Sequence, residues 1–433
     1  MTAVRIPAAA PAPVAALPVA TLATYGIFGM PLAMAALPVY VHLPKYYGGT
    51  LGVDLTLLGL LLLALRLADG IVDPLLGAWS DRARSRKALV VAAAPVLALA
   101  MIALFTPLPR AQGPLLLWLG VSVAAVYLAY SVAMINHNAW GAELSADPVG
   151  RTRITAVREG LALVGVVVAS VAPSFFGAPG DPESGLGAYA WWFAAFTLAC
   201  AAVLWRAPAG RRAPSPVTTV WSGLATPLSD PLFRRLLLVF LANGIASAIP
   251  ATLVLFFIAD VLQAEARQGL FLALYFIAGA AGMPLWVRLS QRVGKARAWM
   301  AGMIAAIVAF IWAWGLGPGD TTAFAAICIL SGLALGADLA LPPSLLADVI
   351  GRHGAMRATG AYFGLWTLAT KLNLALAAGI ALPLLAALGY APGGRAPGAL
   401  AALAFVYAAV PCLLKLGAIV ALRALPPVAA DTR

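Results

Sequence analysis

Two aspartates, Asp69 and Asp73, lie four residues apart inside the apolar stretch 55–79. A carboxylate placed in hydrocarbon costs roughly 2.5–3.5 kcal/mol, so such a group faces a protein interior or a wet cavity. Residues three and four apart share a helix face, which places Arg66, Asp69, Asp73 and Gly77 on one side of a helix. Two carboxylates on one face repel each other unless a cation or protons balance them. The spacing therefore predicts a buried site for a cation or a transferable proton.

Other charges also lie inside apolar stretches, namely the basic Arg158, Lys371 and Lys415 and the acidic Glu159 and Asp338. Arg66 is placed to neutralise Asp69, and that pair alone would be a purely structural contact. Asp73 is then left over, and Lys371 is the candidate to balance it. We predict that Asp69, Asp73, Lys371 and Arg66 form a cation-coupling group. Asp338 has no evident partner, and Lys415 is interpreted as a snorkelling or structural lysine.

These charges must be positioned by membrane helices. Of 433 residues, 63% are hydrophobic and 10% are charged, whereas soluble domains carry about 25% charged residues. Stretches of roughly 20 apolar residues, enough to span a bilayer, recur twelve times. They lie near residues 21–43, 53–79, 88–107, 113–140, 155–178, 188–206, 233–259, 267–289, 298–316, 321–348, 358–388 and 398–424. The predicted fold class is an all-α integral membrane protein with twelve transmembrane helices.

The net charge of +12 is distributed unevenly along the chain. Loops after even-numbered stretches carry seventeen Lys and Arg residues, and loops after odd-numbered stretches carry only Lys45, Arg110, Arg267 and Arg395. Because basic loops remain in the cytoplasm, both termini are predicted to be cytoplasmic in a multi-pass protein of the inner membrane. The basic charge is thus an orientation signal and predicts no nucleic-acid partner.

The longest basic connection separates six stretches from six, and similar basic turns recur in both halves. This pattern predicts two six-helix bundles that alternate access to a central site. The expected parts are a flexible tail (1–20), a first bundle (21–206), a cytoplasmic linker (207–232), a second bundle (233–425) and a C-terminal tail (426–433). Cys200, Cys328 and Cys412 have no metal-ligand spacing. No cofactor is predicted beyond a coupling ion.

The segment from Arg66 to Gly77, Arg-Leu-Ala-Asp-Gly-Ile-Val-Asp-Pro-Leu-Leu-Gly, resembles the second helix of one transporter family. This is the glycoside–pentoside–hexuronide:cation symporter family (melibiose permease-like) of the major facilitator superfamily. The resemblance implies that the two aspartates hold the coupling Na⁺, Li⁺ or H⁺. It continues at Tyr25-Gly-Ile-Phe-Gly29 in the first helix and at Thr367-Leu-Ala-Thr370-Lys371 in the eleventh. It also implies a sugar-stacking role for Trp140 and a site role for Arg158.

Three positions depart from the family pattern. Met30-Pro31 stands where sugar-binding members carry an aspartate, and Asn136 replaces the fourth-helix aspartate that holds sugar hydroxyls. Ala133 stands where a threonine helps to ligate sodium. Because hard cations prefer oxygen ligands, this loss favours H⁺ over Na⁺ at Asp69 and Asp73, with Na⁺ as the alternative. Recognition like that of melibiose is not expected.

A polar and aromatic cluster late in the fourth stretch is the expected core of a substrate site. The predicted substrate-binding residues are Tyr25, Asn136, His137, Trp140, Arg158, Trp366, Thr367 and Asn373. For His137, the alternative is a histidine hydrogen-bonded across helices. Arg158 is alternatively a counter-charge, although its neighbour Glu159 points about 100° away on a helix. Trp366 is alternatively a packing or lipid-facing residue.

The sequence thus predicts a monomeric secondary active transporter that moves a small polar, sugar-like solute with H⁺ or Na⁺. One alternative is a lysolipid or lipid transporter of the same fold, and another is an H⁺-coupled efflux antiporter. An enzyme is not expected, because the chain contains no HExxH, GxSxG or Walker pattern.

Overall fold

The computed structural model describes residues 18–80, 83–109, 111–145, 148–178, 181–209, 225–352 and 359–424. Most of the predicted linker and of both predicted tails lies outside these ranges. Within them are twelve helices long and apolar enough to cross a membrane, from Val19–Thr50 to Pro397–Arg423. The described residues form helices and no extended strand. The prediction of an all-α protein with twelve spans is confirmed.

The first six spans make up the N-terminal half. The first span is built from α1 (Val19–Gly26), α2 (Gly29–Leu37), η1 (Pro38–His42), α3 (Leu43–Lys45) and η2 (Tyr46–Thr50). It extends beyond the predicted end at residue 43 because π-helical turns carry it past its prolines. The other five are α4 (Leu55–Ser80), α5 (Arg86–Phe105), α6 (Gln112–Glu143), α7 (Pro148–Phe176) and α8 (Leu186–Leu204), with the short η3 (Pro182–Gly185) before α8.

The C-terminal half begins with α10 (Ala225–Ser229), and Asp230 then caps the first long helix by accepting hydrogen bonds from the amides of Leu232 and Phe233. Its first three spans are α11 (Pro231–Phe256) with η4 (Phe257–Val261), η5 (Glu265–Arg267) with α12 (Gln268–Val293), and α13 (Lys295–Phe310) with η6 (Ile311–Gly315). Its last three are α14 (Thr321–Arg352), α15 (Thr359–Ala387), and α16 (Pro397–Ala404) with η8 (Phe405–Ala409) and α17 (Val410–Arg423).

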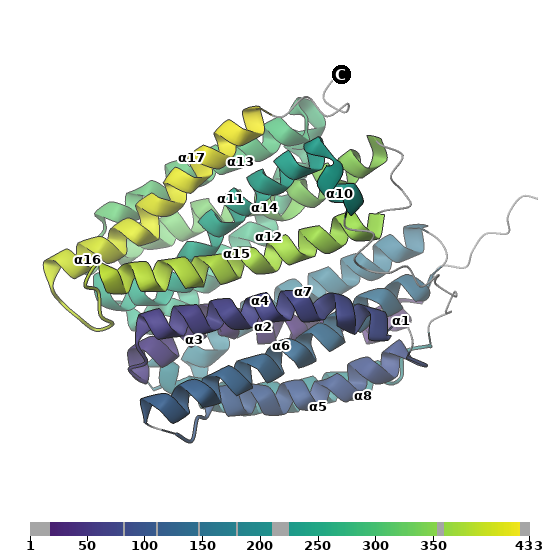
Figure 1. The fold of residues 1–433 in the computed structure, drawn as a ribbon, viewed down its shortest axis with the longest axis horizontal. Coiled ribbons are helices and arrows are strands. Elements are labelled where there is room, and N and C mark those ends of the chain that lie inside the picture. Colours follow the sequence, from purple (N-terminus) through teal and green to yellow (C-terminus); the bar gives the residue numbers. More distant parts are fainter. Residues whose placement is uncertain are drawn as a thin grey trace, which may run out of the picture.

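The two halves form separate groups of helices in space (Figure 1). The purple and blue helices of the N-terminal half lie on one side, and the green and yellow helices of the C-terminal half lie on the other. They meet where α4 packs along α15 and where α7 packs along α12. The boundary between the halves therefore brings α4, which carries the two aspartates, next to α15, which carries Lys371.

Helices α4 and α15 converge at the end where α4 begins and α15 ends, which we call the converging end. A Cβ atom added to Gly59 would lie 2.9 Å from the carbonyl oxygen of Ala378, and one added to Gly379 would lie 2.9 Å from Cβ of Leu63. Only glycine permits so close an approach at these positions. Toward the other end, a Cβ added to Gly77 would meet nothing within 4 Å. The two helices diverge there (Figure 1).

Candidate functional site

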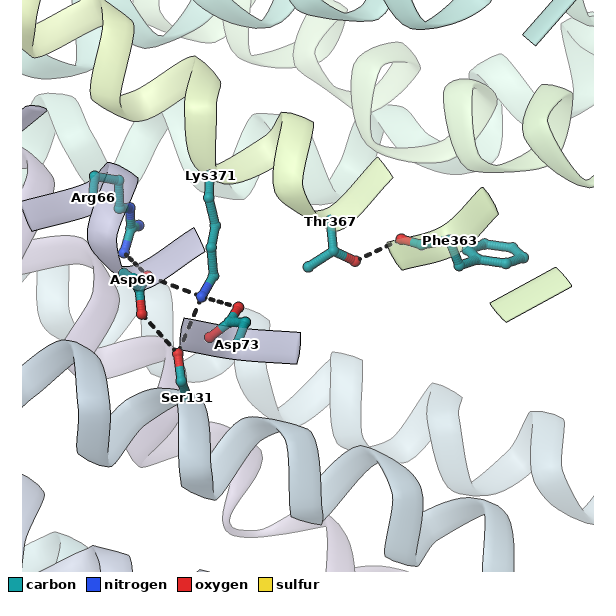
Figure 2. A network of polar contacts seen from close by, with 7 residues as sticks. All are labelled: Arg66, Asp69, Asp73, Ser131, Phe363, Thr367 and Lys371. Carbon is teal, nitrogen blue, oxygen red and sulfur yellow. Dashed lines mark hydrogen bonds and ion pairs between the residues drawn. The ribbon is translucent and has the colours of Figure 1, made fainter. Parts of the chain in front are cut away.

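Lys371 of α15 reaches across the boundary between the halves to the two aspartates of α4 (Figure 2). Its Nζ atom lies 2.9 Å from Oδ2 of Asp69 and also forms an ion pair with Oδ2 of Asp73. The same nitrogen donates a hydrogen bond of 3.1 Å to Oγ of Ser131 on α6, and Ser131 donates one of 3.0 Å to Oδ1 of Asp69. The exposed fractions of the side chains are 4% for Asp69, 18% for Asp73 and 13% for Lys371. One ammonium group thus bridges two largely buried carboxylates.

Arg66 completes this group, which we call the coupling cluster: Arg66, Asp69, Asp73, Ser131 and Lys371. Its guanidinium lies 3.4 Å from Oδ2 of Asp69, one helical turn away on the same face of α4. The structure brings together the four ionisable side chains that were predicted from the sequence to form one group. In their ionised forms, two carboxylates and two cations give a net charge of zero, which suits a site that is mostly removed from water.

Asp73 differs from Asp69 in one respect. Both carboxylate oxygens of Asp69 have partners, but Oδ1 of Asp73 is buried and has no hydrogen-bond partner. An unpaired buried acceptor is costly, about 1–3 kcal/mol. A proton or a small cation would relieve that cost. Among the described residues, no three acidic, histidine or cysteine side chains come together as a metal site.

A small pocket adjoins the coupling cluster between the halves. Its lining includes Arg66, Tyr40, Tyr127, Thr252 and Leu374. With its opening, the space free of protein atoms is ≈ 340 Å³, of which ≈ 20 Å³ is open to the centres of water molecules, room for about one or two waters. The guanidinium carbon of Arg66 lies 4.4 Å from the centre of the Tyr127 ring, a cation–π contact. Hydroxyl groups, an aromatic face and a cation here form the kind of lining that binds a small polar molecule.

Four residues of the cluster and the adjoining pocket were not predicted from the sequence: Tyr40, Tyr127, Ser131 and Thr252. A signal existed for two of them, because Tyr127 and Ser131 are four residues apart and share a face of α6. The comparison with the family placed the sodium-ligating hydroxyl at Ala133, which is fully buried. Ser131, two residues earlier, supplies a hydroxyl to the cluster instead. Tyr40 and Thr252 come from spans 1 and 7, and only the folded structure brings them together.

Tyr25, His137 and Trp140 form one buried aromatic group between α1 and α6. His137 has no exposed surface, and its Nε2 lies 3.0 Å from the carbonyl oxygen of Tyr25. The Tyr25 hydroxyl donates to the carbonyl oxygen of His137 at 2.8 Å, and the two rings stack at 4.3 Å. The Trp140 ring meets Tyr25 edge to face at 5.5 Å. This is the arrangement of a histidine hydrogen-bonded across helices.

The hydrogen-bond and ion-pair partners of Asn136 and Arg158 lie outside the coupling cluster. Asn136 is buried and accepts a hydrogen bond of 2.5 Å from Ser80, which in turn accepts one from Arg86. Arg158 donates to Asn138 and forms an ion pair with Glu159. Although adjacent residues on a helix point about 100° apart, the long side chains of Arg158 and Glu159 bend toward each other and form this ion pair.

The three predicted residues of α15 divide between two faces of that helix. Trp366 stacks on Phe240 of α11 with ring centres 3.9 Å apart. Asn373 packs against Gly244, where an added Cβ would lie 1.8 Å from its Nδ2. Both therefore lie in the contact between α15 and α11, inside the C-terminal half. Thr367 is exposed and donates to the carbonyl oxygen of Phe363 along its own helix (Figure 2).

Comparison with known structures identifies the fold. Over 94% of this chain and 99% of the other, the structure resembles the nucleoside transporter NupG, with a TM-score of 0.70 and 15% identity. It also resembles a bacterial homolog of the human lysosomal transporter Spinster in an inward-facing, unoccupied conformation (TM-score 0.66, 16% identity, 94% of each chain). A third similar structure is tetrameric PepTSo2 (TM-score 0.70, 14% identity, 96% of this chain and 99% of the other).

None of the curated proteins compared with the chain matches it. The family described as MFS/sugar transport protein matches residues 23–426, nearly the whole chain. With twelve membrane-spanning helices in two halves and a charged cluster at their boundary, the chain belongs to the MFS/sugar transport protein family of the major facilitator superfamily.

Proposed function

We propose that this protein is a secondary active transporter that couples movement of a small polar, sugar-like solute to a cation, with H⁺ favoured over Na⁺. The observation that supports this most is the position of Lys371. Its ammonium group lies between Asp69 and Asp73, the place that a coupling cation would take. Lysine and the coupling ion would then compete for the same pair of carboxylates.

Charge balance indicates how a bound cation would displace Lys371 from the two carboxylates. If Lys371 left the cluster, Asp69 and Asp73 would face Arg66 alone, with one negative charge too many for a buried site. A proton on Asp73 would restore neutrality, and its unpartnered Oδ1 is the oxygen available to take one. A bound cation thereby releases Lys371. The released ammonium group can then donate hydrogen bonds to a hydroxyl or carboxylate of the solute.

The solute is proposed to bind beside Arg66 once the two halves move apart, because the pocket there holds only about one or two waters in this structure. Tyr127 offers a ring face, and Tyr40 and Thr252 bring hydroxyl groups to the same space. Hydroxyl-rich solutes such as sugars, glycosides and nucleosides pair well with such groups. The lining residues come from both halves, so a change in the relative position of the halves would change the contacts of a solute bound here.

The converging end is proposed to face away from the cytoplasm, in line with the distribution of basic loops in an inner membrane protein. There Lys45 of α3 and Glu265 of η5 form an ion pair of 2.5 Å between the halves. In alternating access this pair would hold the outer gate closed. We expect Glu265→Gln to shift the population toward the outward-open state by roughly 1.4- to 5-fold, because Glu265 is partly exposed and such pairs contribute about 0.2–1 kcal/mol.

The measurement for Glu265→Gln is the labelling rate of a cysteine introduced at Thr252, with a membrane-impermeant thiol reagent added from outside. Asp320→Asn is the matched control, because Asp320 also lies beyond the converging ends of the spans, and its carboxylate accepts a hydrogen bond from the amide of Gly317 in its own loop. An unchanged labelling rate in Glu265→Gln would show that this ion pair does not gate the pathway.

The proposed function is tested in proteoliposomes of the purified protein that contain a pH-sensitive dye. A pH gradient or a Na⁺ gradient is imposed, and monosaccharides, glycosides, uronates and nucleosides are added in turn. We expect one class of polar solute to trigger proton entry and to accumulate. Accumulation driven by a Na⁺ gradient alone would show that Na⁺, not H⁺, is the coupling ion. Transport of lysophosphatidylcholine alone would show that the substrate is a lipid and not a polar solute. Solute movement that is indifferent to both gradients would refute coupling.

A further inference from the structure

A second buried ion pair lies wholly inside the C-terminal half. Nζ of Lys415 on α17 is 3.0 Å from Oδ2 of Asp338 on α14, and the lysine is 7% exposed. Of the two interpretations of Lys415, snorkelling or structural, the geometry favours the structural one, because the side chain is buried and paired inside the bundle. Asp338, for which the sequence showed no partner, has Lys415 as its counter-charge. Neither residue takes part in the coupling cluster.

The Asp338 carboxylate has its full number of hydrogen-bond partners, whereas the Lys415 ammonium group has fewer than it can take. Oδ1 of Asp338 accepts from Asn243 at 3.0 Å and from Trp299 at 2.8 Å, and Oδ2 accepts from Lys415 and from Ser247 at 3.3 Å. The carboxylate has the four partners that its lone pairs can accommodate. Lys415 donates to Asp338 and, at 2.6 Å, to Asn243. An ammonium group has three hydrogens, so one donor of Lys415 is left for another acceptor.

A cavity adjoins the Asp338–Lys415 pair. Asp338, Lys415 and Ser247 line its polar part, and aromatic residues such as Phe271, Phe310 and Tyr407 line the remainder. With its opening included, the space free of protein atoms is ≈ 840 Å³, of which ≈ 90 Å³ is open to the centres of water molecules. Since one water needs roughly 10–15 Å³ by this measure, the space holds several waters or a small organic group.

We propose that this cavity is a second ligand site, for a small neutral molecule with an apolar body and one hydrogen-bond acceptor. The acceptor would take the free hydrogen of Lys415, and the apolar body would occupy the aromatic part. A neutral ligand fits because Asp338 and Lys415 already balance each other, and an added charge would have no counter-charge in a buried site. A purely apolar ligand would leave the lysine donor unpaired, at a cost.

The cavity is separate from the coupling cluster, but it adjoins the pocket proposed for the solute, because its Val41 and Ala251 are chain neighbours of Tyr40 and Thr252. The cavity is lined by residues of α11, α12, α13, α14, η8 and α17, with Val41 of η1 at its edge. The residues of α4, α6 and α15 that form the coupling cluster do not line it. The proposal therefore does not depend on the identity of the coupling ion or of the transported solute.

The chain carries its own reporters for this site. Cys328 and Cys412 line the cavity, whereas Cys200 is buried in α8 of the other half. The purified protein in nanodiscs would be treated with the small neutral reagent methyl methanethiosulfonate, and each cysteine would be followed by peptide mass spectrometry. We expect Cys328 and Cys412 to react at least tenfold faster than Cys200, because a small neutral reagent can enter the cavity.

Two probes of nearly equal shape then test the hydrogen bond: acetophenone, which has a carbonyl acceptor, and ethylbenzene, which has none. We expect acetophenone to slow the modification of Cys412 about tenfold more than ethylbenzene at equal concentration in the membrane. The difference should vanish in the double variant Asp338→Asn/Lys415→Met, which removes the lysine donor without leaving an unpaired charge. Cys200 should be indifferent to both probes.

Three results would overturn the proposal. The first is equal reactivity of all three cysteines, which would mean that the cavity admits no small molecule. The second is equal protection by the two probes, which would mean that no acceptor is recognised. The third is an excess of protection by acetophenone over ethylbenzene that persists in the double variant, which would place the bound probe away from Lys415. The variant Ala306→Leu, which fills the cavity from α13, should reduce labelling of Cys328 and Cys412 and leave Cys200 unchanged.

Discussion

Replacing Asp73 by asparagine is expected to abolish uphill accumulation of solute while the protein still folds. Asparagine keeps the size of the side chain but cannot bind a proton, so the coupling cluster loses the group with the unpartnered oxygen. A gradient of about two pH units stores roughly 2.7 kcal/mol, enough for roughly a hundredfold accumulation with one proton per solute. The variant should bring the ratio of inside to outside concentration to about one. The measurement is uptake of radiolabelled solute into proteoliposomes.

A charge-balanced variant separates loss of coupling from loss of structure. Lys371→Met leaves Asp69 and Asp73 facing Arg66 alone and should lower the apparent Tm, whereas the double variant Asp73→Asn/Lys371→Met restores the charge balance and should recover most of it. Neither variant should accumulate solute. Accumulation that survives in Asp73→Asn would show that the proton binds elsewhere, and the proposed role of Asp73 would have to be abandoned.

Replacing Lys415 by methionine is expected to lower the free energy of unfolding by roughly 3–5 kcal/mol. The substitution leaves Asp338 charged and buried in the C-terminal half, and removing one partner of a buried ion pair typically costs that much. Asp338→Asn/Lys415→Met should recover most of the loss, because both charges are then gone. The measurement is the fraction of protein that stays monodisperse after heating in detergent.

Lys295→Met provides a matched control for that result. Lys295 and Asp348 also pair across α13 and α14, at 2.7 Å, but their side chains are 29% and 25% exposed. Water screens such a pair, and its loss should cost under about 1 kcal/mol. If Lys415→Met were no more damaging than Lys295→Met, the Asp338–Lys415 pair would be solvated, and the cavity beside it would be an open channel.

The sequence was most informative where function and helix periodicity coincide. Arg66, Asp69 and Asp73 are spaced by one turn on one helix, so their shared face follows from geometry alone. Lys371 could be paired with them because a buried charge needs a counter-charge, even one 298 residues away from Asp73. The twelve spans followed from hydrophobic length, and each agrees with an observed helix. The largest differences are at the end of the first span, which π-helical turns extend to Thr50, and at the start of α7, which begins at Pro148.

The rest depends on contacts that periodicity does not encode. Asp338 and Lys415 are 77 residues apart on helices whose facing sides are set by tertiary packing. His137 and Trp140 were expected to bind substrate because polar and aromatic residues cluster there, but the same chemistry also packs α6 against α1. Ser131 escaped notice because a comparison by position pointed to Ala133. Residue types indicate what chemistry is available, and only packing decides which side chains meet.

The division of the coupling cluster between the halves has an electrical consequence. The carboxylates belong to α4 and the ammonium group belongs to α15, so in the proposed alternating access, rocking one half against the other would displace positive charge relative to negative charge along the membrane normal. One elementary charge moved across the whole membrane corresponds to about 2.3 kcal/mol per 100 mV. Even a fraction of that displacement would make the balance between the inward-open and outward-open states sensitive to membrane voltage. Asp338 and Lys415 both belong to the C-terminal half, so they would move together and add nothing to this sensitivity.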